Sequence, residues 1–291
     1  MTWLITGGTG QLGLAMQIEL GIRGISFIAV SSTQLDISKP ESVDQFVYGV
    51  KPSVIVNVAA WTDVDGAELH QVTAHSVNAF GAKNLAVAAR NVAAIFVHVS
   101  TDYVFSGESS SPWDENAVRD PQSVYGSSKR DGEIFVLDAY PTGTYLVRTA
   151  WLYSEFGRNF ARTMTKLALK SRDEVRVVND QTGQPTSARD LAKQIIGLIL
   201  ADAPFGIYHA TNSGQATWFE FAQEIFNHVG ADLSRLIPVM TNEFPRPAKR
   251  PAYSVLSHSA WANTSIPTMR GWQLALTEAM PAIISAVKAE E

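Results

Sequence analysis

Tyr125 and Lys129 are the residues whose types and spacing first suggest chemistry, within the stretch SVYGSSK at 123–129. If this stretch is helical, side chains four positions apart lie one turn apart on the same face. A tyrosine of pKa about 10 transfers protons poorly at neutral pH, and a cation about 5 Å away would lower that pKa by roughly two units at most. The spacing predicts a proton donor, Tyr125, with Lys129 as its electrostatic partner, although Tyr-x-x-x-Lys also occurs by chance on solvated helices.

A polar run, HVSTDYVFSG at 98–107, ends a predicted strand upstream of this pair. Ligands of open α/β sheets bind at the carboxyl ends of the strands. Thr101 is therefore a candidate to hydrogen-bond the same substrate oxygen as Tyr125. A β-branched residue is also ordinary in a strand, but Tyr125 and Lys129 downstream favour the functional interpretation.

A glycine-rich run, ITGGTGQLG at 5–13, lies between the first predicted strand and the first predicted helix. Either Gly8 or Gly7, taken with Gly10 and Gly13, gives a dinucleotide-binding pattern. Such glycines permit a tight turn, and they let backbone N–H groups at the helix start approach a pyrophosphate. The run predicts a nicotinamide dinucleotide site.

The end of the second predicted strand indicates which cofactor is used. An acidic residue there would bind the adenosine ribose of NADH, but the chain has Ser31, Ser32 and Thr33 instead. Small hydroxyl groups accept a 2′-phosphate without repelling it. Because no arginine accompanies them, we expect only a modest preference for NADPH, with NADH possible.

The elements that must position these residues alternate strand and helix up to about residue 150. Strands are predicted at 3–6, 25–30, 53–59, 93–100 and 144–151, and helices begin near Gln11, Pro40, Ala67 and Tyr125. Ser38 is expected to cap the second helix, with Glu41 completing a capping box. This pattern predicts an α/β fold, a Rossmann-type doubly wound parallel sheet covered on both faces.

The regular alternation of strand and helix ends after Trp151. Helices joined by Pro-rich or Gly-rich connections are expected there, at 158–171, 187–201, 216–229 and 271–288. We expect residues 1–150 to form the NADP(H)-binding domain and 151–291 mainly a smaller substrate-binding region, some of whose segments return to the first sheet. The polar loop at 107–121 precedes the Tyr125 helix, where an active-site flap would be useful. Arg246, Lys249 and Arg250 are candidates to counter a substrate diphosphate.

Composition excludes several classes of function. The 291 residues are 46% hydrophobic and 18% charged, the net charge is −5, and there is no cysteine. A net acidic chain is not expected to bind nucleic acid or an anionic membrane, and six scattered histidines show no metal-ligand spacing. No basic leader and no run of ~18 apolar residues is present. We therefore expect a cytoplasmic protein without a metal site.

Several stretches together resemble the extended short-chain dehydrogenase/reductases: TGGTGQLG, STDY and YGSSK. Within that family the chain is most similar to the reductases of dTDP-4-dehydrorhamnose, through LDIS (35–38), NVAAWTDVDGAE (57–68), RTAWLY (148–153), NFARTM (159–164), NDQTGQPT (179–186), YHATNSGQATWFEFA (208–222) and RPAKRP (246–251). The matches run in order over nearly the whole chain.

The resemblance implies roles for particular residues. Cofactor positions fall on Gly7, Gly10, Gln11, Leu12, Asp36, Ile37, Ala59, Ala60, Thr62, Val99, Tyr125 and Lys129. Catalytic positions fall on Thr101, Tyr125 and Lys129, and sugar-nucleotide positions on Val64, Thr101, Asp102, Tyr125 and Trp151. The implied reaction is NADPH-dependent reduction of the 4-keto group of dTDP-6-deoxy-L-lyxo-4-hexulose to dTDP-L-rhamnose.

Two departures from the pattern matter. Some members have a glutamate early in the first helix that helps bind a magnesium ion bridging a dimer, and this chain has Ala15 there. The bridging Mg²⁺ is therefore doubtful, and monomer and homodimer both stay open. Related dehydratases have a glutamate where this chain has Tyr103, which favours simple reduction. The alternatives are a reductase or epimerase of another nucleotide sugar and a non-catalytic, cofactor-bound regulatory subunit.

Overall fold

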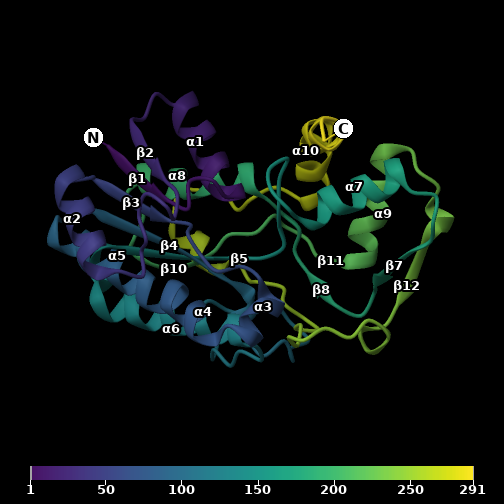
Figure 1. Ribbon diagram of the computed structural model, residues 1–291, viewed down its shortest axis with the longest axis horizontal. Coiled ribbons are helices and arrows are strands. Elements are labelled where there is room, and N and C mark those ends of the chain that lie inside the picture. Colours follow the sequence, from purple (N-terminus) through teal and green to yellow (C-terminus); the bar gives the residue numbers. More distant parts are fainter. Residues whose placement is uncertain (1, 291) are drawn as a thin grey trace.

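A six-stranded parallel sheet forms the centre of the larger part of the molecule (Figure 1). The computed structural model describes residues 2–290. In the order in which they lie across the sheet, the strands are β10 (Gly206–His209), β5 (Thr144–Thr149), β4 (Ile95–Thr101), β3 (Val54–Asn57), β1 (Trp3–Thr6) and β2 (Phe27–Val30). All their pairings are parallel.

Helices cover both faces of this sheet because its strands bury apolar side chains on both sides. On β1, Trp3 and Ile5 pack towards α1 (Gln11–Ile22) and α8 (Ala188–Leu200). Leu4 packs on the opposite face. That face is covered by α2 (Pro40–Val50), α5 (Ala82–Asn91) and α6 (Val124–Ala139). The predicted doubly wound α/β fold is confirmed.

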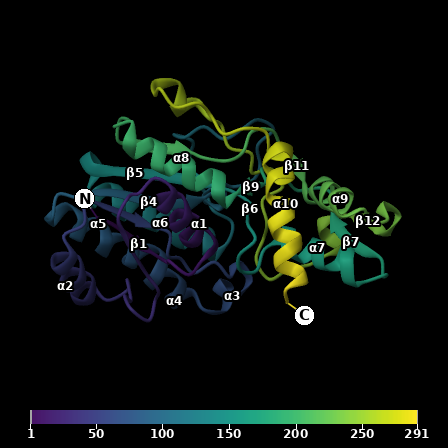
Figure 2. The same cartoon turned by 90° about the horizontal axis from the view of Figure 1, so that it is seen from above.

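A second, smaller group of elements has a core of its own, which contains Tyr153, Phe221 and Trp272. Its members are β6 (Leu152–Tyr153), α7 (Phe160–Lys170), β7 (Val175–Val178), β8 (Thr182–Gly183), β9 (Thr186–Ser187), β11 (Ala216–Thr217), α9 (Trp218–Val229), β12 (Leu236–Val239) and α10 (Trp272–Lys288). Figure 2 shows α10 on the side of this group that faces the sheet layer. Although α8 and β10 follow residue 151, they belong to the sheet layer.

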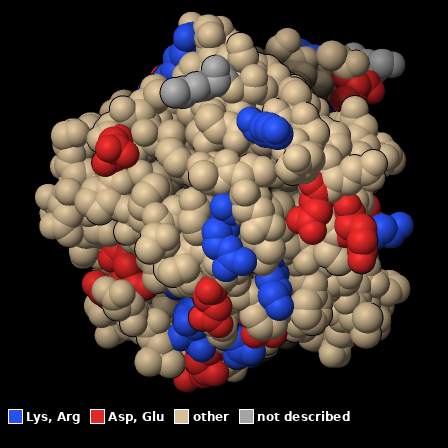
Figure 3. Space-filling model, turned by 90° about the vertical axis from the view of Figure 1, so that its left-hand side faces the viewer, with Lys and Arg blue, Asp and Glu red and all other residues tan. Residues whose placement is uncertain are grey.

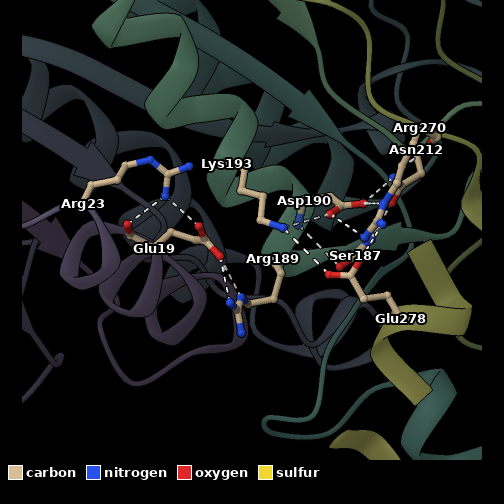
Figure 4. A network of polar contacts seen from close by, with 9 residues as sticks. All are labelled: Glu19, Arg23, Ser187, Arg189, Asp190, Lys193, Asn212, Arg270 and Glu278. Carbon is tan, nitrogen blue, oxygen red and sulfur yellow. Dashed lines mark hydrogen bonds and ion pairs between the residues drawn. The ribbon is translucent and has the colours of Figure 1, made fainter. Parts of the chain in front are cut away.

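A network of charged side chains joins the two groups of elements (Figure 4). Asp190, at the start of α8, accepts hydrogen bonds from Arg270 at 2.8 and 3.0 Å and from Asn212 at 2.9 Å. Arg270 also pairs with Glu278 on α10. Because Asp190 is nearly buried, these contacts are screened less than surface ion pairs. They fix the start of α10 against α8.

The start of α2 differs from the prediction. Its N-cap residue is Lys39, which has no side-chain capping bond. The hydroxyl of Ser38 instead donates to Asp36 Oδ1 at 2.6 Å. The predicted capping box is therefore wrong, because the nearer carboxylate takes the Ser38 hydroxyl.

The polar loop at 107–121 is hydrogen-bonded to residues 253–257, which follow the RPAKRP segment. Trp113 N donates to Val255 O at 2.8 Å, Trp113 Nε1 donates to Tyr253 O at 3.0 Å, and Ser257 N donates to Trp113 O at 2.8 Å. The Trp113 ring also stacks on Phe105 with centroids 4.9 Å apart. These contacts hold the middle of the loop in one position.

The surface carries charges of both signs. On the end of the molecule drawn in Figure 3, lysine and arginine side chains lie among aspartates and glutamates. This face therefore presents no broad patch of a single charge. Between residues 2 and 290, no helix has the length and apolar character needed to cross a membrane.

Candidate active site

The glycine-rich loop lies where the strand order reverses, between β1 and β3. Such switch points are where doubly wound sheets bind ligands. Gly7 has φ of +70°, and a Cβ atom there would lie 2.7 Å from the nitrogen of Ala59. A Cβ atom on Gly13 would lie 2.3 Å from Gly7 O. Both positions require glycine, because the loop turns tightly against the residues after β3 and the start of α1 packs closely on the loop.

The start of α1 fits a dinucleotide. Its N-cap residue is Gly10, and no side chain caps the helix. The first N–H groups of a helix have no partner within it, so those of Gln11 and Leu12 are free to bind an anion. The residues present therefore fit a nicotinamide dinucleotide, which would contribute its pyrophosphate at this helix end.

The other predicted cofactor positions follow neighbouring strands at the same edge of the sheet. Asp36 and Ile37 follow β2, Ala59, Ala60 and Thr62 follow β3, and Val99 lies in β4. Asp36 accepts hydrogen bonds from the N–H and hydroxyl of Ser38, and the Ile37 side chain is buried in the core. Their contacts with a cofactor stay predictions.

The three predicted catalytic residues come together at the end of β4 and the start of α6. Thr101 is the last residue of β4 and is 6% exposed. Ser123 caps α6 by accepting a hydrogen bond from Gly126 N at 3.1 Å, which places Tyr125 in the first turn. Lys129, one turn later, is 2% exposed, and its Nζ donates to Val99 O at 2.7 Å.

The electrostatics of this group differ from expectation in one respect. Burial raises the pKa of Tyr125 to about 12, although a hydrogen bond with Thr101 acts in the opposite direction. Burial also lowers the pKa of Lys129 to about 8. The predicted lowering of the phenol pKa by Lys129 is not found, because burial dominates and the ammonium group is directed to a carbonyl oxygen.

Asp102, predicted to contact the sugar nucleotide, lies buried beside Thr101. Thr101 Oγ1 donates to Asp102 Oδ1 at 2.9 Å. Burial raises the pKa of Asp102 to about 6. A buried carboxyl group with this pKa is partly protonated near neutral pH, so it can either donate or accept a hydrogen bond.

This pKa predicts how stability changes with pH. An unfolded aspartate ionises near pH 4, whereas Asp102 in the folded protein ionises near pH 6, so stability is lost as pH rises between these values. Two pKa units correspond to about 3 kcal/mol. The free energy of unfolding of Asp102→Asn, relative to that of the wild type, should therefore rise by about this much from pH 4 to pH 8. Denaturant unfolding at both pH values measures it, and a pH-independent difference would contradict a buried, ionising carboxylate.

The remaining predicted substrate residues lie at the same edge. Val64 opens α3 (Val64–Leu69). Beside it, Asp65 binds Arg250 through two hydrogen bonds of 2.5 and 2.9 Å, which attaches the RPAKRP segment to α3. Lys249 lies 3.5 Å from Glu108. Arg246 also lies 3.9 Å from Asp65. All three cations are thus paired with carboxylates here, and their contact with a substrate diphosphate stays a prediction. Trp151 follows β5, whose Thr149 is paired with Thr101.

Sequence reasoning missed Asn78, which lies in the π-helical segment Ser76–Gly81 between α4 (Gln71–His75) and α5. Its amide accepts from Trp61 N at 2.8 Å and donates to Trp61 O at 3.1 Å and Ser128 Oγ at 2.9 Å. Asn78 therefore connects the loop after β3 to the helix that carries Tyr125. A π-helical turn has no distinctive apolar period, so the sequence offered no signal for it.

Ala15 stands where some family members have the glutamate that helps bind a bridging magnesium ion. Ala15 offers no ligand atom and is fully buried where α1 packs with α8. Within residues 2–290, no group of three or more His, Asp or Glu side chains could hold a metal ion.

Solved structures show the same fold. A dTDP-4-dehydrorhamnose reductase of Clostridium acetobutylicum superposes with a TM-score of 0.92 at 43% identity, over 97% of this chain and 99% of that one. One from Bacillus anthracis, solved in complex with NADP, has a TM-score of 0.92 at 38% identity, over 96% and 98%. More distantly, the fold is shared with a UDP-glucose 4-epimerase of Thermus thermophilus, at 19% identity and a TM-score of 0.84 over 100% of both chains.

Sequence comparison defines the family. A dTDP-4-dehydrorhamnose reductase of Streptomyces griseus is 44% identical over 97% of this chain and 93% of its own length. A family model described as the RmlD substrate binding domain matches residues 1–284. A match over almost the whole length establishes that the chain belongs to the RmlD substrate binding domain family.

Proposed function

We propose that this protein is an NADPH-dependent oxidoreductase that reduces the 4-keto group of dTDP-4-dehydro-6-deoxy-L-mannose to give dTDP-L-rhamnose. The observation that carries the proposal is the grouping of Thr101, Tyr125 and Lys129 at the end of β4, next to the switch point of the sheet. The relatives' names supply the substrate class, since those with 42–44% identity are dTDP-keto-sugar reductases.

The chain's own residues would provide the proton and the orientation. When bound, NADPH supplies the hydride that adds to the carbonyl carbon. Tyr125 donates its phenol proton to the carbonyl oxygen. The Thr101 hydroxyl, which donates to Asp102 Oδ1 in this structure, turns to donate to that oxygen as negative charge develops on it. A pKa of about 12 keeps the phenol protonated until an alkoxide, a stronger base than phenolate, has formed. Lys129 holds the nicotinamide ribose and adds positive charge.

The identity of the sugar has a specific competitor. A probable dTDP-4,6-dihydroxy-2-methyloxan-3-one 4-ketoreductase of Streptomyces antibioticus is 43% identical, and a dTDP-4-keto-6-deoxy-D-glucose reductase of Streptomyces niveus is 42% identical. These values are too close to 44% to decide among the sugars. All three names share a dTDP carrier and a keto sugar, so this class is the better supported part of the proposal.

The test is NADPH oxidation by the purified protein with a panel of dTDP-4-keto-6-deoxy sugars. We expect turnover with dTDP-4-dehydrorhamnose and none without a sugar nucleotide. Faster turnover of another keto sugar would replace the substrate but keep the reaction. NADPH binding without turnover of any keto sugar would favour the non-catalytic regulatory subunit.

Cofactor selectivity can be tested at Ser31. Its exposed hydroxyl lies 2.8 Å from Thr33 Oγ1 and 3.1 Å from Gln34 Oε1, at the end of β2. Ser31→Asp would place a negative charge near the 2′-phosphate of NADPH, so the ratio of kcat/KM for NADPH to that for NADH should fall roughly tenfold or more. Ser31→Asn is the matched uncharged control. An equal shift in both variants would show that charge is not the cause.

A further inference from the structure

Trp151 has a backbone conformation that needs an explanation. Its φ is +45°, in the left-handed region that side chains other than glycine rarely adopt. Such a residue persists only where its surroundings hold it, and this strain tends to occur at functional sites. Thr149, two residues earlier, pairs with Thr101. Trp151 therefore follows a strand that ends beside Thr101, and its side chain packs against the core of the second group of elements.

Two residues distant in the sequence fix this indole. Trp218, the first residue of α9, stacks on Trp151 with ring centroids 3.5 Å apart and planes 7° from parallel. Gly183 lies against the indole where its two rings meet, since a Cβ atom there would be 2.4 Å from Cε2 and 2.6 Å from both Nε1 and Cζ2. Thr186 N donates to Trp151 O at 3.1 Å. Trp218 and Gly183 thus both hold the indole in place.

Part of the Trp151 indole stays exposed to solvent. Trp151 and Trp218 are both half-buried, unlike Phe221 in the core beneath them, which is fully buried. Phe160 packs at an angle on Trp218, with centroids 4.6 Å apart, and so supports the pair from the core side. A rigid, partly exposed indole offers an apolar surface, which suits the C–H groups of a sugar ring.

We infer that Gly183 and Trp218 are positioning residues for sugar recognition, because together they hold the Trp151 indole in the one orientation that contacts the sugar of the nucleotide-sugar substrate. This inference rests on the proposed function. It also gives a role to the run NDQTGQPT, which contains Gly183 and which the catalytic group leaves unexplained. Neither residue touches the reacting carbonyl, so they act through Trp151.

Gly183→Ala is the direct test, since one methyl group must displace the ring. The matched control is Gly49→Ala on α2, where a Cβ atom meets nothing within 4 Å. We expect Gly183→Ala to raise KM for the sugar nucleotide about tenfold, equivalent to about 1.4 kcal/mol, with the Kd of NADPH unchanged. The control should change neither. Two stacked indoles also give an exciton couplet in far-ultraviolet circular dichroism, which Gly183→Ala should weaken.

Trp218→Phe and Trp218→Leu test the inference without adding atoms beside the ring, in case the alanine variant does not fold. Phe keeps a stacking surface and should largely preserve KM, whereas Leu should raise it like Gly183→Ala. Loss of the couplet with an unchanged KM would overturn the inference, as would equal losses of NADPH and sugar-nucleotide binding. Failure of the wild-type protein to reduce any dTDP-keto sugar would instead overturn the proposed function.

Discussion

Tyr125→Phe is expected to lower kcat roughly a thousandfold, in the range for removal of a general acid, while the Kd of NADPH changes little. The substitution removes only the hydroxyl group that hydrogen-bonds with Thr101. The phenyl ring still fits, so the packing beside Tyr103, whose ring centroid is 5.6 Å away, is retained. Steady-state kinetics with a dTDP-4-keto sugar and a fluorescence titration with NADPH measure the two quantities.

Tyr103→Phe is the matched control for this result. It removes a phenol hydroxyl from the neighbouring ring, and burial raises the pKa of Tyr103 above its usual range. Because Tyr103 has no assigned part in proton transfer, its variant should keep kcat within about tenfold of wild type. Similar losses in both variants would indicate disturbed packing. Near-normal turnover of Tyr125→Phe would remove Tyr125 as the proton donor.

Local patterns were enough to predict the parts of the fold that depend on neighbouring residues. Buried parallel strands are short apolar runs bounded by turns, so β1 and β5 could be located directly. The glycine-rich loop could be recognised because Gly7 and Gly13 serve a steric need that no other residue meets. Tyr125 and Lys129 are separated by one helical turn, so their common helix face follows from spacing alone.

Contacts between distant segments could not be predicted in this way. Trp151 and Trp218 are 67 positions apart, and nothing local indicates that their indoles stack. The pairing of Arg250 with Asp65 likewise depends on how the RPAKRP segment packs on α3. The high pKa of Tyr125 depends on how completely the surrounding chain buries the phenol, whereas helical spacing reports only the distance to Lys129.

Lys129→Met is expected to impair both turnover and cofactor binding, since the Lys129 ammonium group both adds positive charge at the reaction site and holds the nicotinamide ribose. Its Nζ is held 2.7 Å from Val99 O at the cofactor edge of the sheet. Loss of the charge should lower kcat/KM roughly a hundredfold and raise the Kd of NADPH roughly tenfold. Because burial already disfavours the charged form, methionine should leave the melting temperature unchanged or raise it. Lys166→Met, at an exposed position on α7, is the control.

The pH profile separates this charge from a merely structural role. The pKa of Lys129 is lowered to about 8, so the ammonium loses its proton as pH rises through that value. The pH dependence of kcat/KM for NADPH reports groups of the free enzyme, and wild-type kcat/KM should therefore fall above about pH 8. Tyr125, with a pKa of about 12, does not titrate in this range. In Lys129→Met the fall of kcat/KM above pH 8 should be absent. If the fall persists unchanged, the titrating group is not Lys129. If Lys129→Met lowers turnover but leaves the Kd of NADPH unchanged, Lys129 does not hold the nicotinamide ribose.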